Sequence, residues 1–182
     1  AEAYCNRGFN YWLSGDIDRA IEDYNKAISL NSDNVDAYHF RGNAYYKKGQ
    51  YDKAIEDFTR AITINPNDAD VYHVRGLAYN RKGLNDMAIE DYNKSIALNP
   101  NKAVAYTNRG GAYYKKGQHD RAIEDLNKVI ALRPDDAISY YNRGLAYYNK
   151  SQYDKAISDF QKACDMGLQE GCEFLQKALR ER

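Results

Sequence analysis

The sequence contains few of the residues that build metal centres, redox centres or membrane spans. Its 182 residues include three cysteines, three histidines, three prolines and one tryptophan. No apolar run is longer than the four residues 129–132, whereas a membrane-spanning helix needs about 20. We therefore expect no membrane insertion. The chain begins at Ala1 without a basic and apolar leader, so we expect a mature form or fragment that has lost any targeting signal.

An excess of charge of one sign is also missing. The 26 Lys and Arg residues balance 26 Asp and Glu residues, which gives a formal net charge of zero at pH 7. This balance excludes a chain-wide field that would attract nucleic acid or an anionic membrane. Basic pairs such as Lys47-Lys48 and Lys115-Lys116 precede glycines, but cations near a helix C-terminus are ordinary partners of the helix dipole. We predict no nucleic-acid partner.

What the sequence does have is a period of 34 residues. The pair Arg-Gly returns at this spacing from Arg7-Gly8 to Arg143-Gly144 with no insertion, so five repeats fill residues 1–170. The prolines fall at the end of a repeat, where a residue that cannot continue a helix stops one. We predict one domain over residues 1–182, with the repeats 1–34, 35–68, 69–102, 103–136 and 137–170 and a closing helix over 171–182.

Each repeat has the apolar spacing of two amphipathic helices. In the second repeat, Tyr38, Gly42 and Tyr45 lie on one helical face, and a second apolar face begins at Ala54. We expect Gly42 to face Ala54, because two small residues let the helices approach closely. A turn glycine that suits the left-handed end of a helix separates the two helices, at Gly49, Gly83 and Gly117. One hairpin cannot bury its apolar face alone, so we predict an all-α solenoid of packed hairpins.

These residues resemble the tetratricopeptide repeat family. The family pattern of aromatic, Gly, Tyr, Ala, aromatic, Ala and Pro is met in the second repeat by Tyr38, Gly42, Tyr45, Ala54, Phe58, Ala61 and Pro66. The resemblance covers the whole chain. It implies a right-handed α-solenoid of five helical hairpins plus a C-terminal capping helix. It also implies that the first helices of the hairpins line a concave groove that binds peptides or other proteins.

An arginine stands in every repeat where the family usually has leucine. We expect each guanidinium to pair with an Asp of the second helix, because a guanidinium in a tight layer needs a carboxylate to offset the cost of its desolvation. The predicted structural ion pairs are Arg7 with Asp23, Arg41 with Asp57, Arg75 with Asp91, Arg109 with Asp125, and Arg143 with Asp159. The alternative is a set of five ligand-binding arginines.

The fifth repeat departs from the others. Ser151 replaces the turn glycine, and Cys164 and Cys172 flank the turn that follows the second helix. This segment looks like the cysteine-bridged turns of Sel1-like repeat proteins, a resemblance that implies a possible disulfide between these two cysteines. A disulfide would point to the bacterial periplasm or to secretion, whereas two small buried thiols would suit a reducing cytoplasm. The compartment stays open between these two readings.

The groove implied by the resemblance contains polar and aromatic side chains. One row of groove positions is Cys5, His39, His73, Thr107 and Tyr141. The predicted peptide-binding residues are Asn43, Tyr46, Leu77, Asn108, Tyr114, Tyr141, Asn142, Leu145 and Tyr148. We expect the three Asn residues to hold the peptide backbone. A hydrophobic side chain of the ligand is expected to bind at Tyr114, Tyr141, Leu145 and Tyr148. A solvated surface with no ligand is the alternative.

Metal binding and catalysis have little support. Asp36 with His39, and Asp70 with His73, are three residues apart on consecutive helices, and such groups suit Zn²⁺. Neighbouring helices lie about 8 to 10 Å apart, however, which is wide for shared ligands. We predict no metal site and no cofactor. Because a phosphate loop, a zinc-protease helix and a nucleophile elbow are all missing, we also predict that the chain is not an enzyme.

The leading hypothesis is a protein interaction module or scaffold that binds a peptide segment of a partner. The alternative is a self-assembling structural solenoid, hence a homo-oligomer. Residues 1–91 carry 11 basic and 15 acidic residues and are therefore net −4, while residues 92–182 are net +4. Such a dipolar rod would associate head to tail, although salt screens charges over about 8 Å.

Overall fold

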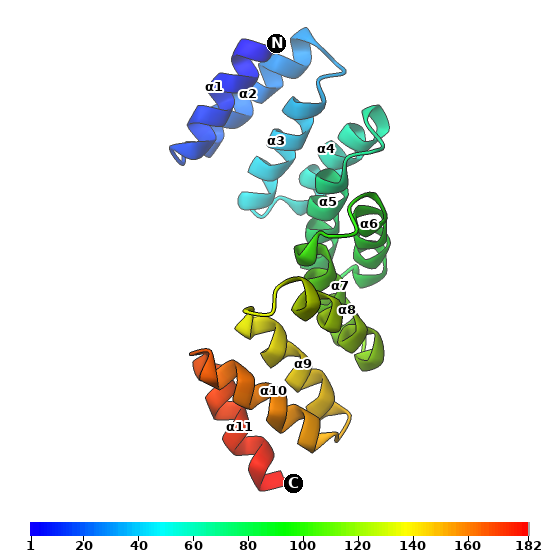
Figure 1. The fold of residues 1–182 in the computed structure, drawn as a ribbon. Coiled ribbons are helices and arrows are strands. Elements are labelled where there is room, and N and C mark those ends of the chain that lie inside the picture. Colours follow the sequence, from blue (N-terminus) through cyan, green and yellow to red (C-terminus); the bar gives the residue numbers. More distant parts are fainter. Residues whose placement is uncertain (182) are drawn as a thin grey trace. The chain divides into compact units, whose positions relative to one another are not determined.

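The computed structural model describes residues 1–181, in which eleven α-helices and no strand are found (Figure 1). The predicted all-α class, with helical hairpins and an additional C-terminal helix, is confirmed. The chain divides into two compact units, Ala1–Asn99 and Pro100–Arg182, each of which has its own helix packing.

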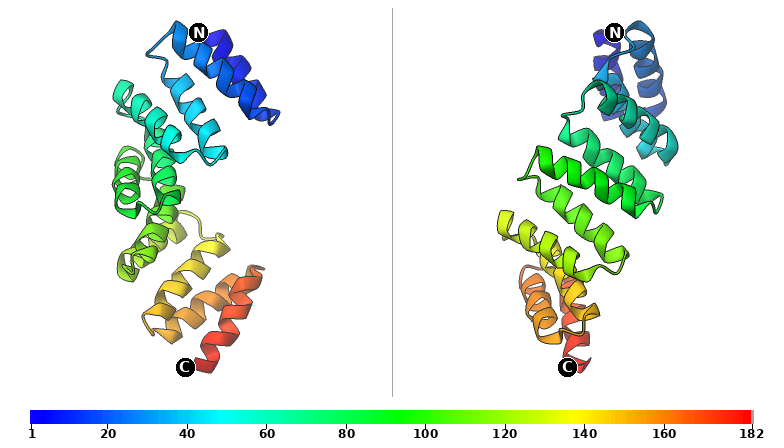
Figure 2. Two further views of the ribbon diagram at one scale, coloured as in Figure 1. Left: turned by 180° about the vertical axis from the view of Figure 1, so that it is seen from behind. Right: turned by 90° about the vertical axis from the view of Figure 1, so that its right-hand side faces the viewer.

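The N-terminal unit contains three helical hairpins. They are formed by α1 (Glu2–Leu13) with α2 (Ile17–Leu30), α3 (Val35–Lys47) with α4 (Tyr51–Ile64), and α5 (Ala69–Arg81) with α6 (Asn85–Leu98). The second helix of a hairpin also packs on the next first helix, so that α2 contacts α3 and α4 contacts α5 (Figure 2). The first helices α1, α3 and α5 are therefore neighbours, and they form one side of this unit.

The C-terminal unit contains two hairpins and one further helix. The hairpins are α7 (Ala103–Lys115) with α8 (His119–Leu132) and α9 (Ala137–Asn149) with α10 (Tyr153–Asp165). The last helix, α11 (Gln169–Glu181), packs on α10 and also contacts α9 (Figure 2). It thus occupies the place that a first helix takes beside the preceding hairpin.

The closing helix begins earlier than the sequence predicts. It was expected over residues 171–182, but α11 starts at Gln169, 32 positions after the start of α9. One residue of this difference comes from the three-residue junction Met166-Gly167-Leu168, in which Gly167 has a φ of +89° and turns the chain as the glycines inside the hairpins do, because the other hairpins are separated by four residues. The other comes from α10, which has 13 residues where the other second helices have 14, so α11 enters its first-helix position two residues ahead of the 34-residue period.

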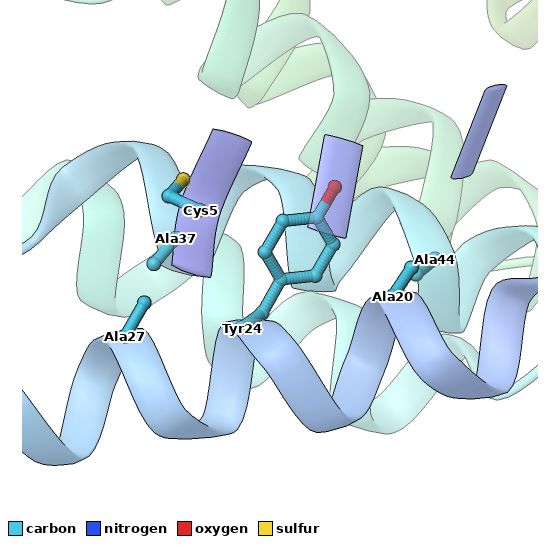
Figure 3. Packing of buried hydrophobic residues seen from close by; sticks show 6 residues of the cluster. All are labelled: Cys5, Ala20, Tyr24, Ala27, Ala37 and Ala44. Atoms are coloured by element: carbon cyan, nitrogen blue, oxygen red, sulfur yellow. The ribbon is translucent and has the colours of Figure 1, made fainter. Parts of the chain in front are cut away.

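The repeated glycines meet both the expected alanine and an aromatic ring of the second helix: a Cβ added to Gly8 would stand 3.2 Å from the Ala20 carbonyl oxygen, and one added to Gly110 would stand 3.5 Å from that of Ala122. The Phe58 ring lies over Gly42, and a Cβ added to this glycine would stand 2.5 Å from the nearest ring carbon. Tyr24 covers Gly8 in the same way, and Figure 3 shows Tyr24 rising from α2 between its neighbours Ala20 and Ala27. The helices therefore approach closely, as the small residues predict, and a ring one turn after the alanine packs over the glycine at Gly8 and Gly42.

Candidate functional site

The structure brings each repeated arginine together with its expected aspartate. Arg75 Nε donates to Asp91 Oδ2 at 2.8 Å, and Arg75 Nη2 donates to Asp91 Oδ1 at 2.7 Å. The same two-bond fork joins the other four pairs, with donor–acceptor distances of 2.6 to 2.9 Å. The five carboxylates are buried. Bidentate pairing of this kind fixes the guanidinium plane as well as its charge.

Three of the arginines also connect their hairpin to the one before it within the same unit. Arg41 Nη1 donates to Asn25 Oδ1 of α2 at 2.6 Å, and Arg143 Nη1 donates to Asn127 Oδ1 of α8 at 2.7 Å. Arg75 reaches Thr59 of α4 in the same way, at 3.0 Å. Sequence reasoning missed this bond, although short polar side chains at one position of the second helices were a readable signal.

Two tyrosines enclose most of these guanidinium groups. Arg75 lies 5.7 Å from the Tyr72 ring centre and 5.8 Å from that of Tyr79, within cation–π range. The same pair of rings flanks Arg41, Arg109 and Arg143. The tyrosines that recur in every repeat are therefore partners of the arginine. With its nitrogens bonded inside the fold and its faces covered, such an arginine offers little to a ligand.

Burial raises the pKa of the aspartates in three of the ion pairs. It raises the pKa of the Asp57 carboxyl, and the hydrogen bonds and charge of Arg41 act in the opposite direction. The pKa values of Asp91 and Asp125 are raised for the same reason. Each carboxylate therefore depends on its arginine to remain ionised in a buried position.

A cavity of about 90 Å³ opens on the first helices of the C-terminal unit. It is lined by Thr107, Gly110, Gly111, Tyr114, Leu126, Asn142 and Leu145, which belong to α7, α8 and α9. Three of the residues predicted to bind a peptide, Tyr114, Asn142 and Leu145, are thus brought to one place. The side-chain amide of Asn142 makes no hydrogen bond within residues 1–181, so it can both accept and donate.

Tyr141 and Tyr148 lie against α11. The Tyr141 ring is 5.5 Å from that of Phe174, and the Tyr148 hydroxyl donates to the Glu181 carboxylate. Lys177 also stands over the Tyr148 ring, at 5.1 Å. The same arrangement occurs one hairpin earlier, where Asn149 Nδ2 donates to the Tyr114 hydroxyl at 2.6 Å. Asn149 is the last residue of α9, just as Glu181 is the last residue of α11. The two rings are thus already engaged by the last helix.

In the N-terminal unit, Asn43 lines a smaller cavity. This cavity has a volume of about 70 Å³, and its other walls are Phe9, Trp12, Tyr24 and Phe40. The remaining predicted residues lie apart from it: the Tyr46 hydroxyl accepts a bond from Arg81 Nε at 3.1 Å, and Leu77 is half-buried on α5. Asn108 belongs to α7 in the other unit and is also half-buried.

The expectation that Cys5 and His73 face a groove is wrong. Cys5 is 5% exposed and packs between α1, α2 and α3, and His73 is 8% exposed beside the ring of Tyr92. Cys5 and His73 occupy the same position of their repeats, and this position faces the second helix. A thiol or an imidazole is small enough to be covered there. Desolvation, together with the charges of Asp36 and Glu2, raises the pKa of the Cys5 thiol to about 11.

The part of the chain that the structure describes contains no group of three or more His, Cys, Asp or Glu that could hold a metal ion. None of the helices in residues 1–181 combines the length and the apolar character that a membrane span requires.

A disulfide between Cys164 and Cys172 joins α10 to α11, with 4.7 Å between the two Cα atoms. The neighbouring residue Gly171 permits this close approach, because a Cβ added there would stand 2.9 Å from the backbone nitrogen of Cys164. Cys5 is the free cysteine.

The sequence matches two family models. The model described as TPR repeat matches residues 10–49, 42–83, 76–117 and 110–151, and the model described as Tetratricopeptide repeat matches residues 137–166. These matches cover most of the chain. No curated protein matches the sequence.

Solved structures share the fold. The chain is similar to a crystal structure of MamA, with 32% identity and a TM-score of 0.85 over 87% of this chain and 93% of that chain. It is similar to YrrB, described as a TPR protein with an unusual peptide-binding site, with 26% identity and a TM-score of 0.83 over 98% and 89%. MamA 41-end from Desulfovibrio magneticus RS-1 is 20% identical with a TM-score of 0.86 over 91% and 93%, which shows the fold alone.

Proposed function

We propose that this chain, which belongs to the tetratricopeptide repeat family, is a protein-interaction module that binds an extended peptide segment of a partner protein on its first helices. The observation that carries the proposal is the cavity between α7, α8 and α9, where Tyr114, Asn142 and Leu145 meet. An apolar hollow with an unpaired amide beside it suits a ligand that has both a side chain to bury and a backbone to bond.

The rigidity of the surrounding helices supports this proposal. Each hairpin is held by a buried ion pair, and the arginine of α9 is bonded to α8 as well. A surface that is fixed before binding costs little to order, so more of the interaction energy appears as affinity. The solved structure of YrrB, whose description includes a peptide-binding site, supports the same class of ligand for this chain.

A peptide-array screen with the intact chain tests the proposal. The screen is repeated with Asn142→Ala, which removes the unpaired amide, and with the matched control Asn10→Ala, which changes an exposed asparagine of α1 in the other unit. We expect hits whose signal falls at least fivefold with Asn142→Ala and is unchanged with Asn10→Ala. Hits that are insensitive to both substitutions, in folded protein, would contradict binding at this surface.

We propose a role in binding without catalysis and without nucleic acid. The alternative is self-association, in which another copy of the chain is the partner. Light scattering over a range of protein concentrations tests it: a constant mass leaves the peptide as the partner, and a growing mass supports assembly.

A further inference from the structure

We infer that the cavity between α7, α8 and α9 receives one apolar side chain of leucine or phenylalanine size from the bound peptide, and that Gly111 and Leu126 create this preference. The inference rests on the proposed function and specifies its ligand. Neither residue belongs to the set that sequence reasoning assigned to peptide binding.

Gly111 contributes no side chain to the cavity, whereas the equivalent residue of every other repeat has one. The equivalent position holds Phe9, Asn43, Leu77 and Leu145. A Cβ added to Gly111 would have no heavy atom within 4 Å, apart from its own helix backbone and chain neighbours. The fourth repeat therefore lacks the side chain that elsewhere projects from the first helix into this region.

Leu126 makes the same region deeper. The equivalent position holds an aromatic ring in the other repeats, namely Tyr24, Phe58, Tyr92 and Phe160. Those rings come within 2.5 to 2.8 Å of a Cβ placed on the facing glycine, whereas Leu126 Cγ is 3.7 Å from a Cβ placed on Gly110. Two reductions in side-chain size, one from each helix of a hairpin, thus coincide in a single repeat.

The next pair of first helices shows what fits such a space. Between α9 and α11, the space is occupied by Leu145, Phe160 and Phe174. The rings of Phe160 and Phe174 are 5.6 Å apart. Phe174 is the sixth residue of α11, just as Asn142 is the sixth residue of α9. The chain therefore fills the space beside α11 with its own leucine and phenylalanine, whereas the equivalent space stays open at about 90 Å³ beside Gly111 and at about 70 Å³ beside Phe9 and Tyr24.

The lining of the cavity disfavours a charged occupant. None of its seven lining residues is charged, and the exposed residues Val104 and Ile138 come one helical turn before Thr107 on α7 and Asn142 on α9. A charged group placed there would lose water without gaining a partner. The volume of about 90 Å³ corresponds to about three water molecules, which leaves room for a branched aliphatic group.

Capped amino acids provide a test that needs no natural ligand. The intact protein, with ¹³C-labelled leucine methyl groups, is titrated with N-acetyl-leucine amide, N-acetyl-phenylalanine amide, N-acetyl-alanine amide and N-acetyl-lysine amide. We expect the leucine and phenylalanine compounds to shift the methyl signals of Leu126 and Leu145 and to bind at least tenfold more tightly than the other two. Equal binding of all four compounds, or shifts confined to other leucines, would overturn the inference.

Two substitutions close the cavity from opposite sides. Gly111→Leu introduces the residue that α9 carries at Leu145, and Leu126→Phe introduces the ring found at Phe58 and Phe160. Each is expected to weaken binding of the leucine compound at least tenfold while circular dichroism shows an intact helical fold. Gly111→Ala adds only one methyl group at the same position and is expected to weaken binding less than Gly111→Leu does, whereas the control Asn10→Ala on α1 is expected to leave the affinity unchanged.

Peptide hits from the array separate this inference from the proposed function. Hits that lose signal with Asn142→Ala and also with Gly111→Leu support both. Hits that lose signal with Asn142→Ala but keep it with folded Gly111→Leu and with folded Leu126→Phe support peptide binding and overturn the assignment of the cavity. Loss of binding with Gly111→Ala as severe as with Gly111→Leu would also overturn it, because the effect would then not depend on filled volume.

Discussion

The two sides of the first helices follow different rules. The side that meets the second helix of its own hairpin carries the same arginine and glycine in every repeat. The hydrogen bond from arginine Nε to aspartate Oδ2 is 2.8 Å long at Arg41, Arg75 and Arg143 alike. The opposite side changes from repeat to repeat, as glycine at Gly111 and leucine at Leu145 illustrate. The comparison teaches that, within this one chain, repetition marks positions that hold the fold, while variation marks positions that are free to recognise something else.

The largest effect should follow from breaking the repeated side. Arg75→Leu leaves the buried Asp91 carboxylate without its partner, so we expect a loss of about 3 to 5 kcal/mol in the free energy of unfolding. Chemical denaturation followed by circular dichroism measures it. Arg7→Leu should cost less than half as much, because the Arg7 side chain is 58% exposed and that of Arg75 is 16% exposed. Equal losses at both positions would show that burial does not set the strength of these pairs.

The disulfide provides the next test, because it holds α11 over the variable side of α9. Changing Cys164 and Cys172 together to serine removes a short covalent loop, and we expect a loss of about 2 to 3 kcal/mol. Thermal unfolding measures it. A thiol assay gives an independent check on the starting protein: after denaturation without reductant it should detect the single thiol of Cys5, and after reduction it should detect all three cysteines. Three thiols before reduction would contradict the bond.

Replacing glycine by alanine should change the free energy of unfolding in opposite directions on the two sides of the first helices. Gly42→Ala pushes a methyl group into the Phe58 ring and should destabilise the protein by about 1 to 3 kcal/mol. Gly111→Ala meets open space and improves helix propensity, so it should stabilise the protein by up to about 1 kcal/mol. Denaturation midpoints of the two variants, measured together, make the comparison. A stabilising Gly42→Ala would mean that the ring does not press on this glycine.

The smallest effect concerns Cys5, which stands at a position that varies but is buried. Its folded pKa of about 11 lies above the ordinary value of 9.0, so folding favours the neutral thiol. This contribution to stability is complete below pH 9 and is lost as the pH rises to about 11. Unfolding measured from pH 8 to pH 11 should show a decline that is weaker in Cys5→Ala. An equal decline in both proteins would contradict the shift.

The sequence is most informative where a pattern repeats. The period predicts the hairpins, and two charged residues that recur 16 positions apart indicate a partner for each arginine. It is less informative where the result depends on side-chain size or helix rotation. The ring over Gly42 and the burial of Cys5 and His73 depend on how far a side chain reaches once two helices have packed. The cavity at Gly111 cannot be predicted from one repeat alone, because its walls come from α7, α8 and α9.

The single tryptophan provides the molecule with a local optical reporter. Trp12 is held on α1 with the Lys47 ammonium 5.4 Å from its ring centre, and its indole nitrogen is buried. Its emission therefore responds to loosening of α1 from α3 in the N-terminal unit. Fluorescence and far-ultraviolet ellipticity recorded on one sample would reveal whether the two compact units melt together or in succession.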